Sequence, residues 1–402
     1  MNKANLYKLI LVVLLISLIP NIVITFQSLL NHTILLENKT FEVSHESIIV
    51  SFLLYISLLL LLLMISMYFI QKMRVSYQLN NKVSFRLGLF ILILQCLFVI
   101  FNYIYQINTA GYNSKGLSPW YLNYFFILFN PDTLFLIYIF ITKNSLLKKT
   151  NIIIFLISTI SRGWMGGILP IITYFFCTSR INIRIIFPLI IVFLLNLPFL
   201  FNAKWFFREH NISDISLDLI VNLFDFSTGY FQALFDTFNY IINRLQHITI
   251  ISYIYDLSDS IYPLKNNFLS VYSEGLPQRL FHTMLDTDYI LLNQYIVQNF
   301  IADNNANWNV QVGLSSWFII SPLQSIFLII YFSALLIIAH SIPILKKIYN
   351  YHLLVLYLAI FTLLVGWVST FINVIIYGLI SAIIIKLFNL KTSIFNEDKD
   401  EK

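Results

Sequence analysis

Long apolar runs alternate with short polar segments along almost the whole chain. Each run is continuous, which is typical of helices and unlike the alternation expected of strands in a membrane barrel. A helix needs about 20 apolar residues to cross a bilayer. The pattern therefore predicts about ten spans, at residues 7–30, 47–70, 87–107, 120–142, 151–161, 163–179, 185–203, 314–340, 352–370 and 371–390.

The composition favours the same fold class. Of the 402 residues, 58% are hydrophobic and only 11% are charged. A soluble domain of this size needs far more charge on its surface. We therefore expect an all-α polytopic membrane protein with lipid as its surroundings. The two cysteines, Cys96 and Cys177, lie inside apolar runs and predict neither a disulfide framework nor a metal site.

The basic residues predict the orientation. With the N-terminus in the cytoplasm, 17 of the 25 lysines and arginines lie on the cytoplasmic side, as the positive-inside rule expects. The net charge of +6 is therefore a membrane signal and not evidence of nucleic-acid binding. The predicted organisation is an N-terminal transmembrane bundle (1–203), a large external loop (204–313), C-terminal transmembrane helices (314–390) and a cytoplasmic tail (391–402).

The large loop contains an amphipathic segment at about residues 228–250. Its apolar positions recur with a helical period, and its polar positions, including His247, fall on the opposite face with Arg244 at the margin. This pattern predicts a helix that lies on the membrane surface or caps the bundle. The remaining loops are short, and a long structured loop on one face usually carries function.

One arginine interrupts the apolar stretch 151–180. An unpaired charge at membrane depth costs at least about 2.5 kcal/mol, so we expect Arg162 to face a wet cavity or an anionic partner. Ser161 and Gly163 flank it, and small residues permit close helix packing and a backbone break beside a cavity. We predict two short helices that meet at 161–163. The alternative is one long helix whose arginine extends to the interface.

Four external arginines are candidates for binding phosphate, because guanidinium groups bind phosphate oxygens in a bidentate manner. They are Arg162, Arg208, Arg244 and Arg279. The alternative for Arg208 and Arg244 is a solvated position near lipid headgroups. His282 would share a helical face with Arg279 and is a candidate general base. Trp308, within an asparagine-rich stretch, could contact a sugar, although such stretches also form ordinary turns.

The chain resembles the Wzy-type polymerases of O-antigen and other oligosaccharide repeat units, which are related to the O-antigen ligases. The resemblance is carried by Ser161-Arg162-Gly163 opening a short apolar helix, by one long late external loop, and by about ten spans without a soluble domain. It implies a bacterial inner membrane protein with cytoplasmic termini and a periplasmic loop. It also implies transfer of a growing glycan from undecaprenyl diphosphate onto a new lipid-linked unit.

The resemblance further implies no cofactor or metal, and a chain-length regulator as a partner. In such an enzyme Arg162, Arg279 and His282 would be catalytic. Ser161, Gly163, Arg244, His247 and Trp308 would bind the lipid-linked donor and acceptor. Two other activities stay open: a flippase for the same lipid-linked unit, and an O-antigen ligase. A structural or assembly partner without chemistry is a further alternative.

Overall fold

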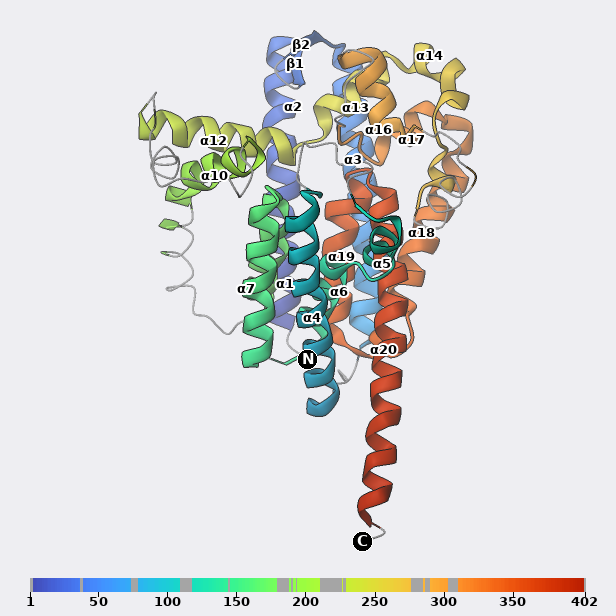
Figure 1. Cartoon of the computed structure of the whole chain (residues 1–402). Helices are drawn as coiled ribbons and strands as arrows, with labels where there is room; N and C mark the ends of the chain where they lie inside the picture. Colours follow the sequence, from blue (N-terminus) through green and yellow to red (C-terminus); the bar gives the residue numbers. More distant parts are fainter. Residues whose placement is uncertain are drawn as a thin grey trace. The chain divides into compact units, whose positions relative to one another are not determined.

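The structure is a computed structural model that describes residues 3–36, 39–73, 79–108, 118–143, 145–178, 188, 191–192, 194–209, 226, 229–275, 285, 290–302 and 310–400. These residues are mostly helical (Figure 1). The one exception to the predicted all-α fold within these ranges is a short antiparallel hairpin of β1 (Thr33–Leu36) and β2 (Lys39–Glu42). The chain divides into two compact units, and each is described separately.

Unit 1 comprises Ile10–Tyr77 and Asn243–Leu379. Its elements are the end of α1 (Lys3–Val13), a π-helical turn (Leu14–Leu18), α2 (Ile19–Asn31), the hairpin, α3 (His45–Lys72), α13 (Ile248–Asp256), α14 (Ser258–Ile261), 3₁₀ turns at Tyr262–Asn267 and Val271–Ser273, α16 (Leu292–Ile296), a π-helical turn (Val297–Ile301), α17 (Ser315–Ile320), a 3₁₀ turn (Pro322–Gln324), α18 (Ser325–Ser341), a 3₁₀ turn (Leu345–Lys347), α19 (Tyr349–Leu358), a π-helical segment (Ala359–Leu364) and the start of α20 (Val368–Asp400).

The core of unit 1 is α19. Every residue of this helix except Asn350 is buried, and the helix packs against α3 and α18. A helix that is apolar on all sides is stable only when other elements surround it. In contrast, α18 is apolar but much of it is exposed. Ile326 and Phe327 in its first turn, and Leu323 in the 3₁₀ turn before it, are more than 60% exposed. An exposed surface of this kind suits contact with lipid.

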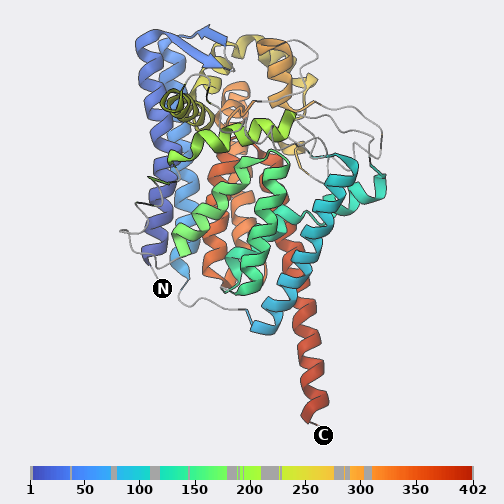
Figure 2. The ribbon, with the colours of Figure 1, turned by 60° about the vertical axis from the view of Figure 1, so that its left-hand side comes forward.

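The helix α13 lies inside unit 1 and not on its surface. It packs against α2, α3 and α17, and every residue from Ile248 to Ile254 is buried. Ser47 and Ser51 on α3 and Ser252 on α13 are fully buried, and small side chains of this kind allow two helices to approach closely. At one end, Asp256 of α13 accepts hydrogen bonds from Ser44 at the start of α3. In Figure 2 the hairpin lies at one end of the α2–α3 pair.

Unit 2 comprises Asn2–Leu9, Gln78–Ile242 and Ile380–Lys402. Its elements are the start of α1, α4 (Asn81–Tyr105), α5 (Trp120–Leu128), α6 (Pro131–Ile141), α7 (Leu146–Ser161), a 3₁₀ turn (Met165–Gly167), α8 (Ile168–Thr178), α10 (Leu197–Glu209), most of α12 (Tyr230–Leu245) and the end of α20. Helices α4 and α7 run side by side (Figures 1 and 2). Asn151 on α7 donates a hydrogen bond to the carbonyl of Gly88 on α4.

Two predicted helices are interrupted. The span predicted at 120–142 consists of two helices, α5 and α6. The side chain of Asn130 caps α6, and Pro131 follows it. Helical backbone is disfavoured at the residue before a proline, so the first helix ends before Asn130. The amphipathic helix predicted at 228–250 ends at Leu245, and α13 begins at Ile248. The Gln246 side chain accepts the Thr249 N–H, and Asn21 accepts the His247 N–H. These bonds replace the helical ones at the break.

Six helical stretches among the described residues are long and apolar enough to cross a membrane, which confirms the membrane character of the chain. They are Leu6–Asn31, His45–Lys72, Asn81–Tyr105, Trp120–Ile141, Pro322–Ser341 and Val368–Asn389. The helices Ile168–Cys177 and Tyr349–Leu364 are apolar but shorter. The full set of ten spans and the external position of residues 204–313 remain predictions.

Candidate functional site

Arg162 lies at a break between two short helices of unit 2. Helix α7 ends at Ser161, Arg162 caps its C-terminus, and α8 begins at Ile168. Gly163 has φ of +68°, in the left-handed region that glycine adopts without a Cβ penalty. The Ser161 hydroxyl donates to the carbonyl of Ser158. The Ser-Arg-Gly sequence therefore turns the chain at the end of α7.

The guanidinium of Arg162 is buried and held by three groups. Its Nε donates to the Ser158 carbonyl at 2.9 Å, and its Nη2 donates to Asp132 Oδ2 at 2.8 Å. The guanidinium carbon lies 5.0 Å from the centre of the Phe98 ring, within the range of a cation–π interaction. The arginine side chain is 8% exposed and that of Asp132 is 29% exposed. The anionic partner expected for Arg162 is thus a carboxylate of the same unit.

The sequence interpretation missed Asp132. It stands in the first turn of α6, directly after the Asn130 cap and Pro131. Its Oδ1 atom is buried without a hydrogen-bond partner. A signal was present in the sequence, since Asp132 is a lone carboxylate inside an apolar stretch, and intramembrane ionisable groups are a default indication of function. Its pairing with Arg162, 30 residues away, could not be inferred without the fold.

The other predicted site residues are distributed as follows. Ser161 and Gly163 adjoin Arg162 in unit 2. Arg244 is exposed in the last turn of α12, and His247 is buried; both belong to unit 1. Arg279, His282 and Trp308 lie outside the described residues.

The His247 side chain is enclosed in unit 1. Its ring lies near Tyr55 of α3, with 6.1 Å between ring centres, and its Nδ1 is buried without a partner. Burial lowers the pKa of His247 to about 4, because the charged imidazolium loses its hydration. The imidazole is therefore neutral near pH 7. It contributes to the α12–α13 junction and is not on the surface.

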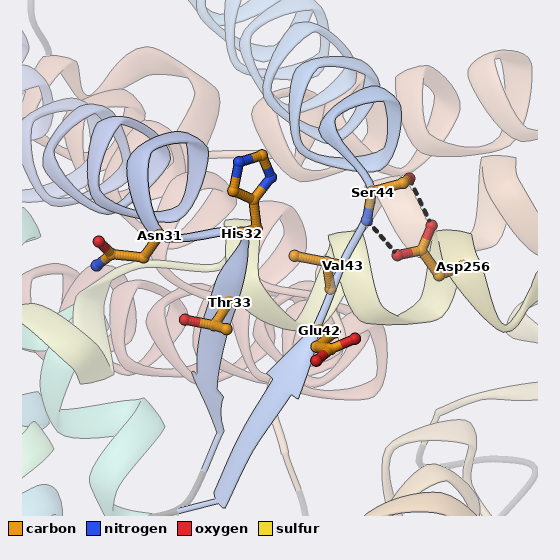
Figure 3. Close-up of a pocket in the computed structure, with 7 residues that line it drawn as sticks. All are labelled: Asn31, His32, Thr33, Glu42, Val43, Ser44 and Asp256. Carbon is orange, nitrogen blue, oxygen red and sulfur yellow. Dashed lines mark hydrogen bonds between the residues drawn. The ribbon is translucent and has the colours of Figure 1, made fainter.

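A hollow of about 400 Å³ lies at the hairpin end of unit 1 (Figure 3). Its lining is polar except for Val43 and includes two carboxylates; the lining residues are Asn31, His32, Thr33, Glu42, Val43, Ser44 and Asp256. Asp256 already accepts hydrogen bonds from the backbone and hydroxyl of Ser44, as Figure 3 shows. One of the two carboxylates therefore has a structural role, because it holds Ser44, the residue that caps α3.

Within the described residues, no group of three or more histidine, cysteine, aspartate or glutamate side chains is placed to hold a metal ion. No family model, curated protein or solved structure matches this chain.

Proposed function

We propose that this chain is a membrane glycosyltransferase that polymerises lipid-linked oligosaccharide repeat units. It would transfer the growing glycan from undecaprenyl diphosphate to a new lipid-linked unit at the periplasmic face of a bacterial inner membrane. The resemblance carried by Ser161-Arg162-Gly163 supports this activity, as does the apolar character of the helices. Both substrates are lipids, and a multi-pass membrane protein can receive them from the bilayer.

The observation that carries the proposal is the buried guanidinium at the break between α7 and α8. Arg162 is fixed by Ser158 and Phe98 and paired with a carboxylate that is partly exposed. A fork that binds a carboxylate also suits a phosphate. In the proposed reaction the acceptor hydroxyl attacks the anomeric carbon, and its proton passes to a general base, for which His282 is the candidate. The bond from that carbon to the diphosphate oxygen breaks. A fixed cation stabilises the leaving diphosphate.

The test is the length of the surface polysaccharide made with variants of Arg162. Arg162→Ala, at normal expression, should abolish long chains and leave single repeat units, whereas Arg162→Lys should retain part of the polymerisation because the charge remains. Gly166→Ala, in the 3₁₀ turn that follows, is the control and should make full-length chains, because a Cβ there meets no atom within 4 Å. Full-length chains with Arg162→Ala would refute the role of the arginine. Loss of all surface glycan, including single units, would indicate a flippase instead.

A further inference from the structure

We propose that Asp132 is an exchangeable counter-ion for Arg162. In the resting protein it would occupy the place that the diphosphate takes during the reaction, and so it would set how strongly charged an anion must be to bind. This inference rests on the proposed function, since it names the residue that controls access to the same guanidinium. Neither the sequence motif nor the resemblance points to Asp132.

The bond between the two residues is one-sided. Only Oδ2 of Asp132 accepts from Arg162, at 2.8 Å, and Oδ1 is buried without a partner. Two parallel bonds make an arginine–carboxylate pair stronger and fix its geometry. A buried acceptor without a partner also carries a desolvation cost. The carboxylate is therefore held less firmly than in a bidentate pair, and its departure costs correspondingly less.

The arginine would stay in place when the carboxylate leaves. Its Nε is bound to the Ser158 carbonyl, and its charge lies over the Phe98 ring. The arginine side chain is 8% exposed against 29% for Asp132, so the carboxylate is the outer member of the pair. Asp132 also lies in the first turn of the eleven-residue helix α6, where the helix dipole favours a negative charge. Asp132 thus has an alternative source of stabilisation, and the exchange displaces only one partner.

The exchange predicts selectivity among anions. A buried arginine left without a counter-charge is strongly destabilised, so an incoming anion has to replace everything that Asp132 supplies. A lipid monophosphate offers fewer acceptor oxygens and less charge than a diphosphate. We therefore expect the carboxylate to exclude monophosphate lipids more effectively than diphosphate lipids.

The test is native mass spectrometry of the purified full-length chain with undecaprenyl diphosphate and undecaprenyl monophosphate. The wild-type protein should prefer the diphosphate by at least tenfold. Asp132→Asn, which is nearly isosteric but uncharged, should bind the monophosphate at least tenfold more tightly than wild type, about 1.4 kcal/mol, with a smaller preference between the two lipids. Asp132→Glu keeps the competing charge and should resemble wild type. Thermal unfolding confirms that each variant is folded.

The outcomes separate this inference from the proposed function. Suppose that wild type binds the diphosphate lipid and that Arg162→Gln does not. If Asp132→Asn then binds the monophosphate lipid no more tightly than wild type does, the counter-ion role is refuted and the proposed function stands. Equal affinity of the wild-type protein for the two lipids also refutes the counter-ion role, without any variant. If wild type binds neither lipid, both the inference and the proposed function fail.

Discussion

Single residues illustrate what hydropathy patterns can and cannot predict. Arg162 stands out because a charge in an apolar stretch requires a partner or water. The same reasoning applies to Asp132. However, the sequence does not show that two charged residues on different helices form an ion pair. The burial of His247 could not be predicted from the sequence either. Its position on the polar face of a predicted amphipathic helix favoured a solvent-exposed side chain. Its contacts come from α2 and α3, more than 190 residues away in the chain.

The burial of His247 predicts a pH dependence of stability. With its pKa at about 4 in the folded protein and about 6.5 in an unfolded chain, the unfolded state binds a proton between these values that the folded state does not. Stability should therefore fall as the pH drops from about 6.5 towards 4. Between pH 7.5 and 5 the loss attributable to this residue is about 2 kcal/mol.

The measurement is thermal unfolding in detergent at pH 7.5 and pH 5 for wild type and His247→Gln. The glutamine variant should lose less stability between the two pH values, because the amide does not titrate. His45→Gln, at an exposed histidine, is the control and should behave as wild type. An identical pH response of wild type and His247→Gln would contradict the buried, neutral imidazole.

At the scale of helices, the apolar periods predicted where helices occur better than where they stop. The amphipathic period continues through 246–247, so nothing in the local pattern marks the end of α12. The break depends on the Gln246 side chain and on a hydrogen bond to Asn21 from a distant helix. The break between α5 and α6 had a local signal in Asn130-Pro131, but the surrounding apolar residues outweighed it in the sequence interpretation.

The approach of two chain segments at Gly313 and Gly366 gives a test at this scale. Gly366 has φ of +91°, and a Cβ there would lie 2.8 Å from the backbone nitrogen of Gly313. The Gly313 N–H also donates to the Val365 carbonyl. Gly366→Ala should therefore destabilise the protein by roughly 2 kcal/mol or more, since a left-handed non-glycine residue already costs about 1–2 kcal/mol.

Thermal unfolding of Gly366→Ala beside Gly166→Ala measures this effect. A Cβ at Gly166 meets no atom within 4 Å, so that variant should unfold close to the wild-type temperature. Equal unfolding temperatures for the two variants would show that the close approach of 313 and 366 is absent or tolerates a side chain.

For the molecule as a whole, composition was sufficient to predict a helical membrane protein, and six stretches have the length and apolarity to cross a bilayer. The number of spans stays a prediction, because helices such as α19 are apolar and also buried in a protein core. Hydropathy alone does not distinguish a buried helix from a lipid-facing one. The predicted external loop also contains α13, a core helix of unit 1.

The orientation of the chain can be tested on α3 alone. This helix has 28 residues and is therefore about 42 Å long, which exceeds the roughly 30 Å hydrocarbon core. Thr40 in the hairpin before α3 and Gln71 near its end are both exposed. After replacement of Cys96 and Cys177 by alanine, a membrane-impermeant maleimide should label Thr40→Cys in intact cells, and Gln71→Cys only after the membrane is opened. The reverse pattern would place the N-terminus outside and contradict the positive-inside assignment, and labelling of both sites in intact cells would show that α3 does not span.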